Sequence, residues 1–202
     1  MPRKSRNYFA NTPYLIFQFG HNFQPCFFEN EDYDFFSQLL LDSCAQHQAK
    51  LLQQKLFNNQ FFLLLNGTNS HSLPKVLQNT CSIYGRYIND KYLRTGSLWQ
   101  GRHKASPIQD GIYIDAVNDF ISTPVLPRQF SEAKTSAASD LSVSCINTLI
   151  LANLARNQAI GDDKFLGSVK NHKMLQSKKT IVPRTRHGLM PLLSDRPPMV
   201  RT

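Results

Sequence analysis

A continuous apolar run at residues 60–66, QFFLLLN, restricts the possible folds more than any other part of this sequence. A run without polar alternation is typical of a central strand that is covered on both faces. The pair Asn58-Asn59 precedes the run, and Asn tolerates the backbone geometry of a tight turn. Residues 50–57 are therefore expected to form the other strand of a β-hairpin.

Two amphipathic helices and two further strands surround this hairpin in the sequence. In chain order, the expected elements are a strand at 14–19, a helix at 32–47, the hairpin, a helix at 73–92, a strand at 103–108 and a short helix at 110–122. The order β-α-β-β-α-β predicts an α+β fold of the ferredoxin-like (split βαβ) type, an antiparallel sheet with helices on one face.

Changes in composition predict how the rest of the chain is organised. The expected segments are a basic N-terminal extension at 1–12, the main domain at 13–126, a linker at 127–142, a helical appendage at 143–176 and a basic tail at 177–202. The tail is expected to be disordered without a partner, because it is rich in Pro, Arg and Lys.

The charge of the chain favours a nucleic-acid partner over an acidic protein or a membrane. The formal net charge is +9, and residues 170–202 alone hold eight Lys or Arg and one Asp. The four cysteines show neither CxxC pairing nor zinc-ligand spacing. No signal sequence and no stretch of about 18–20 apolar residues is found, so we expect a soluble cytoplasmic protein without a membrane span.

The stretch 84–104, YGRYINDKYLRTGSLWQGRHK, interleaves basic and aromatic residues around a loop that contains two glycines. Such a mixture is typical of nucleic-acid binding, with cations for phosphates and rings for bases. The predicted DNA-binding residues are Arg86, Lys91, Arg94, Trp99, Arg102, His103 and Lys104. An alternative is that Trp99 plugs the core under a surface loop whose charges are only solvated, and that the basic tail serves solubility.

Several segments, in order, resemble the REP-associated tyrosine transposases of the HUH superfamily of single-strand DNA transposases and relaxases. They are the strand LFNNQFFLLL, the block GRYIND-Y-RTGSLWQGRHKAS, Tyr113 at the start of a short helix, and the later segment NQAIGDDKFLGSV. The resemblance covers about residues 12–190. It implies the ferredoxin-like fold, a monomer, and a partner in structured single-stranded (hairpin) DNA.

The resemblance also implies a chemistry and the residues that would perform it. In such enzymes a tyrosine attacks a DNA phosphodiester and becomes joined to the 5′ phosphate, and two histidines around a bulky apolar residue bind Mg²⁺ or Mn²⁺. Tyr113 falls on the nucleophile position, and Gln60 and Phe62 fall on the two histidine positions, with Phe61 between them. Gln60 offers one oxygen and Phe62 offers no ligand atom, so the HUH motif is degenerate and no metal ligands are predicted.

These observations lead to one expected function and leave two alternatives open. We expect a transposase-like DNA-binding protein that recognises hairpin DNA, derives from a tyrosine transposase and is impaired in metal-dependent cleavage. The first alternative is an active single-strand DNA endonuclease or transposase that uses Tyr113, with a site rebuilt from Gln60 and His103. The second is a decaying protein without a selected function, in which Tyr113 is an ordinary aromatic residue near a helix start.

Overall fold

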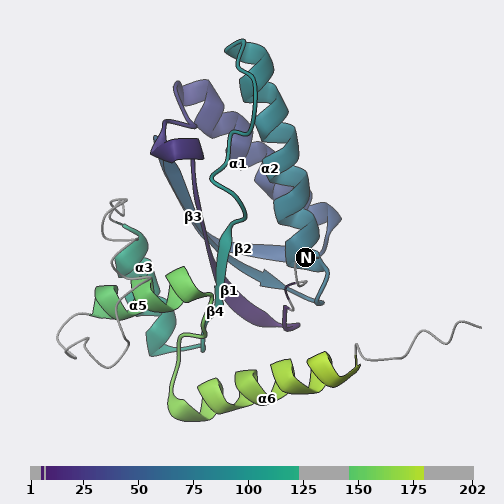
Figure 1. Cartoon of the computed structure of the whole chain (residues 1–202), viewed down its shortest axis with the longest axis vertical. Coiled ribbons are helices and arrows are strands. Elements are labelled where there is room, and N and C mark those ends of the chain that lie inside the picture. The colour runs from purple at the N-terminus through teal and green to yellow at the C-terminus, as the bar shows by residue number, and fades with distance from the viewer. Residues whose placement is uncertain (1–5, 7, 123–145, 180–202) are drawn as a thin grey trace, which may run out of the picture.

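The computed structural model describes residue 6, residues 8–122 and residues 146–179, and Figure 1 shows how they are arranged. An antiparallel sheet of four strands has the order β2-β3-β1-β4. The strands are β1 (Thr12–Phe19), β2 (Ala49–Phe57), β3 (Gln60–Gly67) and β4 (Lys104–Pro107). Helix α1 (Asn30–Gln46) connects β1 to β2, and α2 (Ser72–Lys91) connects β3 to β4. This connectivity confirms the predicted α+β, ferredoxin-like fold.

The predicted hairpin is present, and its second strand lies inside the sheet. Phe57 pairs with Gln60 across the Asn58-Asn59 turn, and β3 then runs between β2 and β1. All but one residue of β3 are buried. The unbroken apolar sequence of this strand therefore reflects coverage on both sides, as predicted.

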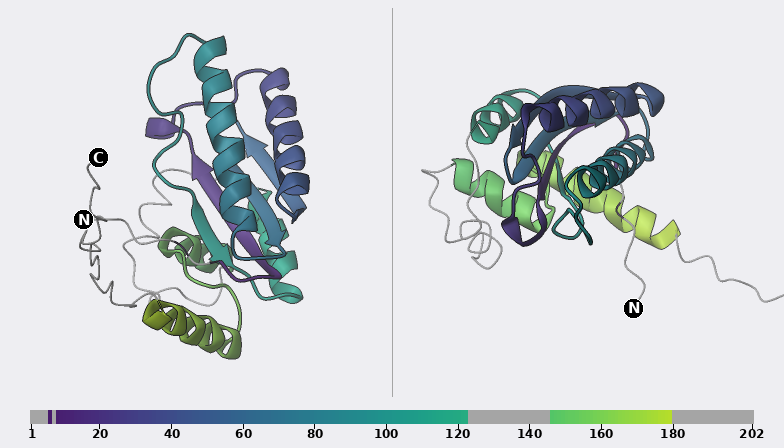
Figure 2. Two further views of the ribbon diagram at one scale, coloured as in Figure 1. Left: turned by 90° about the vertical axis from the view of Figure 1, so that its right-hand side faces the viewer. Right: turned by 90° about the horizontal axis from the view of Figure 1, so that it is seen from above.

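Helices α1 and α2 cover one face of the sheet, side by side, as Figures 1 and 2 show. Alternate residues of the central strands face these helices, among them Ile16 of β1 and Phe61 and Leu63 of β3. Tyr84 of α2 is fully buried in this first core, and its hydroxyl donates a hydrogen bond of 2.8 Å to the carbonyl oxygen of Cys26. That bond satisfies the one polar group that the ring carries into the core.

The opposite face of the sheet is covered by α3 (Ile112–Ile121) and α5 (Ile146–Arg156). Phe17 of β1 and Phe62 and Leu64 of β3 face these helices and form the second core with them. The predicted layer of helices on one face is formed by α1 and α2. The other face carries α3 and α5 in addition. Helix α5, predicted as part of an appendage, packs directly against the sheet.

The segment after α5 covers the outer edge of β4. The side chain of Asn157 accepts a hydrogen bond of 3.0 Å from the backbone N–H of Ala105, and Ile160 forms a parallel bridge with Ile108. Helix α6 (Asp163–Lys179) follows. An edge strand offers unpaired backbone groups, so this segment satisfies part of the edge within the same chain.

Two predicted segments cannot be compared with the structure. The linker at 127–142 lies outside the described residues, and so does all of the tail beyond residue 179. Among the helices that the structure does describe, none is both long and apolar enough to cross a membrane.

Candidate nucleic-acid interface

Tyr113 lies at the start of α3, on the side of the sheet that carries the second core. Gly111 precedes the helix with a φ of 86°, a backbone conformation that favours glycine, and so turns the chain from β4 into α3. The Tyr113 ring is half-buried and packs against the second core. Helix α3 therefore presents this tyrosine beside the face to which Gln60 and Phe62 point.

Of the two positions that the resemblance assigns to metal-binding histidines, both are buried, and Phe62 is enclosed by aromatic rings. Phe62 has no exposed surface and stacks on Phe17, with ring centroids 4.5 Å apart. Phe57 and Phe120 meet the same ring edge to face at 6.3 and 5.6 Å. A hard divalent cation needs oxygen or imidazole ligands, so this aromatic cluster does not fit Mg²⁺ or Mn²⁺. Elsewhere in the described residues, no three His, Cys, Asp or Glu side chains form a group that could hold a metal ion.

The glycine-containing loop before β4 folds back along the end of β1. The N–H of Gln100 donates to the carbonyl of Phe19 at 2.9 Å, and the N–H of His21 donates to the carbonyl of Leu98 at 2.7 Å. Gly101 has a φ of 66°, which allows the turn out of this pairing. The loop thereby carries Trp99 onto the face of the sheet that α1 and α2 cover.

Trp99 belongs to the first core and is not an open stacking platform. Its side chain is 9% exposed, and its indole Nε1 donates to the carbonyl oxygen of Cys81 at 3.0 Å. The ring stacks on Tyr84 at a centroid distance of 5.9 Å with an interplanar angle of 29°, and it meets Phe61 edge to face at 5.3 Å. A base could stack on this ring only if the core opened, so the alternative in which Trp99 plugs the core describes its position.

The charge of Lys91 is already matched within the fold. Its ammonium lies 3.2 Å from Glu29, 3.3 Å from Glu31 and 3.0 Å from the fully buried Asp32. The hydrogen bond to Asp32 raises the pKa of Lys91 and outweighs the opposing effect of burial, and Tyr87, Glu29 and Glu31 raise it further. The Lys91 ammonium therefore serves to hold α1 and α2 together and is not part of the candidate interface.

The other predicted cations are not gathered in one place. Arg86 is exposed on α2, and Arg94 is half-buried with its guanidinium 5.8 Å from the Phe28 ring centre. Arg102 is exposed in the loop before β4, and Lys104 is half-buried at the first position of that strand.

His103 is held in its neutral form. Its Nε2 forms a 2.8 Å hydrogen bond with the hydroxyl of Tyr8. Burial, followed by the charges of Arg6 and Arg102, lowers the pKa of His103 to about 3, so the imidazole carries no charge at neutral pH. His103 lies on the α2 side of the sheet and Tyr113 packs on the other side, so the structure does not join them in one site with Gln60.

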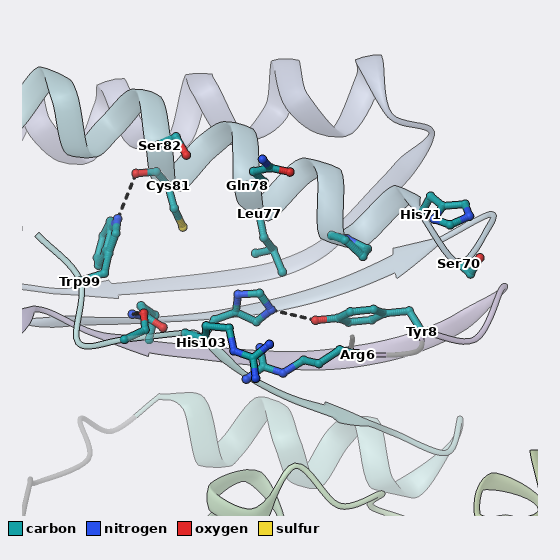
Figure 3. Close-up of a pocket in the computed structure, with 14 residues that line it drawn as sticks. Arg6, Tyr8, Ser70, His71, Leu77, Gln78, Cys81, Ser82, Trp99 and His103 are labelled. Carbon is teal, nitrogen blue, oxygen red and sulfur yellow. Dashed lines mark hydrogen bonds between the residues drawn. The ribbon is translucent and has the colours of Figure 1, made fainter. Parts of the chain in front are cut away.

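A groove of about 740 Å³ brings three predicted residues together with several that sequence reasoning missed. Figure 3 shows it between α2 and the layer that holds the N-terminal segment and the loop before β4. Trp99, Arg102 and His103 line it, and so do Arg6 and Tyr8 from the N-terminal segment. The only sequence signal for this second group was the basic composition of the first residues. A smaller hollow on the other side of α2 includes Arg86.

Comparisons with known proteins give matches to solved structures only. No protein-family model matches the sequence, and no curated protein is significantly similar to it. Among solved structures, a "putative transposase" from Deinococcus radiodurans R1 is 17% identical with a TM-score of 0.42, over 60% of this chain and 96% of that chain. A REP-associated tyrosine transposase bound to a REP hairpin is 10% identical with a TM-score of 0.45, over 66% of this chain and 74% of that chain. At this similarity, the fold class rests on the strand order and helices of the chain itself.

Proposed function

We propose that this chain is a transposase-like protein that binds structured single-stranded DNA as a monomer and is impaired in metal-dependent strand cleavage. The observation that carries the proposal is the packing of Phe62. The sequence resemblance assigns a metal-binding histidine to this position, and the position instead holds a fully buried ring within an aromatic cluster. The neighbouring helix still carries a tyrosine at the nucleophile position.

The chemistry explains why cleavage depends on that position. A phenol with a pKa near 10 is a weak nucleophile at neutral pH, and it needs an activating group or a polarised phosphate. In the resembled enzymes the metal polarises the phosphate and stabilises the charge that develops as the bond breaks. Gln60 alone cannot hold a divalent cation, because one amide oxygen supplies one of the roughly six ligands that such ions take.

DNA binding is supported by charges that are independent of the aromatic cluster. Arg86 and Arg102 are exposed, and the net charge of the chain is +9. Guanidinium groups bind phosphate oxygens in a forked geometry, and each phosphate contact releases bound counterions. Binding is therefore expected to weaken steeply as the salt concentration rises.

A nicking assay tests the proposed loss of cleavage. The full chain and its Tyr113→Phe variant are incubated with hairpin oligonucleotides in Mg²⁺ or Mn²⁺, and the products are examined for cleavage and for a covalent protein–DNA adduct. We expect neither product from either protein, although both bind the hairpin. Efficient cleavage that disappears in Tyr113→Phe would overturn the proposal and establish the alternative of an active endonuclease.

The active-endonuclease alternative retains one observation in its favour. Tyr113 is half-buried at the start of α3, beside the face to which Gln60 points, which suits a nucleophile at a substrate surface. A site rebuilt from Gln60 and His103 is not favoured, because His103 bonds to Tyr8 on the other side of the sheet.

The second alternative, a protein without a selected function, is tested by gel shifts at moderate salt. Equal affinity for hairpin and random DNA would favour that alternative.

A further inference from the structure

The groove between α2 and the loop before β4 has a charged end and an uncharged remainder. Its volume of about 740 Å³ lies within the roughly 300–1,000 Å³ that is usual for small-molecule sites. No Asp or Glu is among the described residues that line it. The described lining thus combines two arginines with no acidic side chain, and an anionic group is the natural complement.

The charged end is formed by Arg6 and Arg102, which face the groove from segments far apart in the sequence. Burial lowers the pKa of Arg6, Tyr8 partly offsets this effect, and the nearby charge of Arg102 adds to it. The Nη1 atom of Arg6 is buried and has no hydrogen-bond partner. A buried guanidinium N–H without an acceptor is costly, so a phosphate oxygen at this point would stabilise it.

The uncharged part offers hydrogen-bonding groups above an apolar floor. The neutral imidazole of His103 lies at the wall, held by its bond to Tyr8. Leu77 and Trp99 border the groove but are only 1% and 9% exposed, so the surface that α2 offers comes mainly from the half-buried Pro74 and the exposed Gln78. Figure 3 shows His103 and Arg6 opposite Leu77 across the groove. A phosphate would fit the charged end of the groove, and an uncharged planar group with polar edges, attached to that phosphate, would fit the uncharged part.

We propose that this groove holds one unpaired nucleotide, with its phosphate at Arg6 and Arg102 and its base between His103 and the α2 surface at Pro74 and Gln78. The inference rests on the proposed function, because it takes the nucleotide from a bound single strand. The proposed site differs in two ways from the set of DNA-binding residues that the sequence predicted. Arg6 and Tyr8 become part of the interface, and the nucleotide lies on the face of the sheet opposite Tyr113.

The single tryptophan of the chain makes occupancy of the groove measurable without a label. Trp99 borders the groove, so a base that enters should change its fluorescence. The probes are a hairpin with an unpaired 5′ extension, the same hairpin with a blunt end, the extended hairpin with an abasic extension, and thymidine monophosphate. We expect the extended hairpin to bind roughly tenfold more tightly than the blunt one, and the abasic extension to lose most of that gain.

Paired variants separate the groove from the general charge of the protein. Arg6→Gln removes one charge from the groove, and Lys55→Gln removes one charge from the exposed β2 strand at the other edge of the sheet. Gln78→Phe narrows the groove, and Ala45→Phe adds the same ring to an exposed position on α1. We expect the two groove variants to lose the advantage of the extended hairpin and the fluorescence change, and the two controls to keep both.

The outcomes distinguish the groove from the proposed function. If the extended hairpin retains its advantage in Arg6→Gln and Gln78→Phe, the groove assignment is wrong and DNA binding stands. If thymidine monophosphate alone binds and no strand does, the groove takes a free nucleotide and the strand is not its source. If the folded wild-type chain binds no DNA in any arm, the proposed function fails, and the strand-derived nucleotide fails with it. Circular dichroism confirms that each variant is folded.

Discussion

The buried carboxylate of Asp32 provides the sharpest test of how residues far apart in the sequence hold this fold. Asp32 is fully buried near the N-terminus of α1 and accepts hydrogen bonds from five donors. They are the backbone N–H groups of Phe28 and Glu29 at 3.0 Å each, the hydroxyls of Tyr92 at 2.8 Å and Tyr87 at 3.1 Å, and the ammonium of Lys91 at 3.0 Å. The carboxylate therefore fastens the start of α1 to the end of α2.

The cost of Asp32→Asn follows from this environment. Burial alone would raise the pKa of Asp32, but the hydrogen bonds from Lys91, Tyr92 and the two backbone groups outweigh it and lower the pKa to about 2. After allowance for screening at the partly exposed Lys91, a shift of this size is worth about 1–2 kcal/mol. Asn also turns an N–H₂ group toward donors, at a further cost of about 1 kcal/mol. We expect a loss of about 2–3 kcal/mol, or roughly 5–10 °C in Tm for a chain of this size.

Urea unfolding of the wild-type chain and of Asp32→Asn, from pH 7 to pH 2, measures the difference in their free energies of unfolding and how that difference depends on pH. The folded pKa lies below the ordinary value of 3.8, so the contribution of the carboxylate is complete above about pH 4 and is lost as the pH falls through about 2. The difference between the two proteins should therefore shrink over that interval. A difference under about 0.5 kcal/mol at pH 7, or one that is unchanged at pH 2, would refute the reasoning.

The same network gives an expectation for Lys91, which the sequence suggested as a DNA contact. Lys91→Gln should lower Tm, because it removes the cation that faces Asp32 and two further carboxylates. Its DNA affinity should match that of the wild type once both are folded, whereas Arg86→Gln should weaken binding and leave Tm unchanged. The reverse pattern would place Lys91 in the interface.

Two further changes test the second core. Gln60→His combined with Phe62→His should lower stability by about 2–4 kcal/mol in urea unfolding, because it places polar rings in an aromatic cluster, and calorimetry should detect no Mn²⁺ binding. Heat from stoichiometric Mn²⁺ binding would contradict this description of the cluster. Asn157→Ala should cost about 1–2 kcal/mol, because it removes the acceptor for a β4 N–H and places Ala at a φ of 55°. An unchanged Tm would mean that α5 is not fastened to the sheet at this point.

The sheet and its helices could be predicted because their signals are local. The continuous apolar sequence of β3 reports burial on both faces, and the helical spacing of apolar residues locates α1 and α2. The place of α5 could not be predicted in the same way. Its apolar face fits a separate helical appendage as well as it fits a sheet, and only the packing of residues such as Leu154 into the second core decides between them.

The residues of the interface were harder to predict, because residue type does not tell which way a side chain points. Trp99 and Lys91 are residue types that are common in DNA-binding surfaces. In this fold Trp99 packs in the core, and Lys91 pairs with Glu31 and Asp32. Tyr8 and His103 show the converse. They are 95 positions apart, and nothing in the sequence near either residue indicates that they meet. A groove assembled from four separate segments leaves no spacing pattern in the sequence.

The alternation of side chains along β1 separates the two candidate activities of this protein. Gln18 points to the α2 side and lines the groove, where its amide donates a hydrogen bond to the carbonyl of Gly101 at 3.1 Å. Its neighbours Phe17 and Phe19 point to the other side and pack in the second core with Phe62. Aromatic packing around Phe62 therefore affects one face of the sheet without altering the side chains that form the groove on the other. Under the two proposals, this chain has lost strand cleavage on one face of the sheet and still binds an unpaired nucleotide on the other. Variants on the two faces should then affect stability and binding independently.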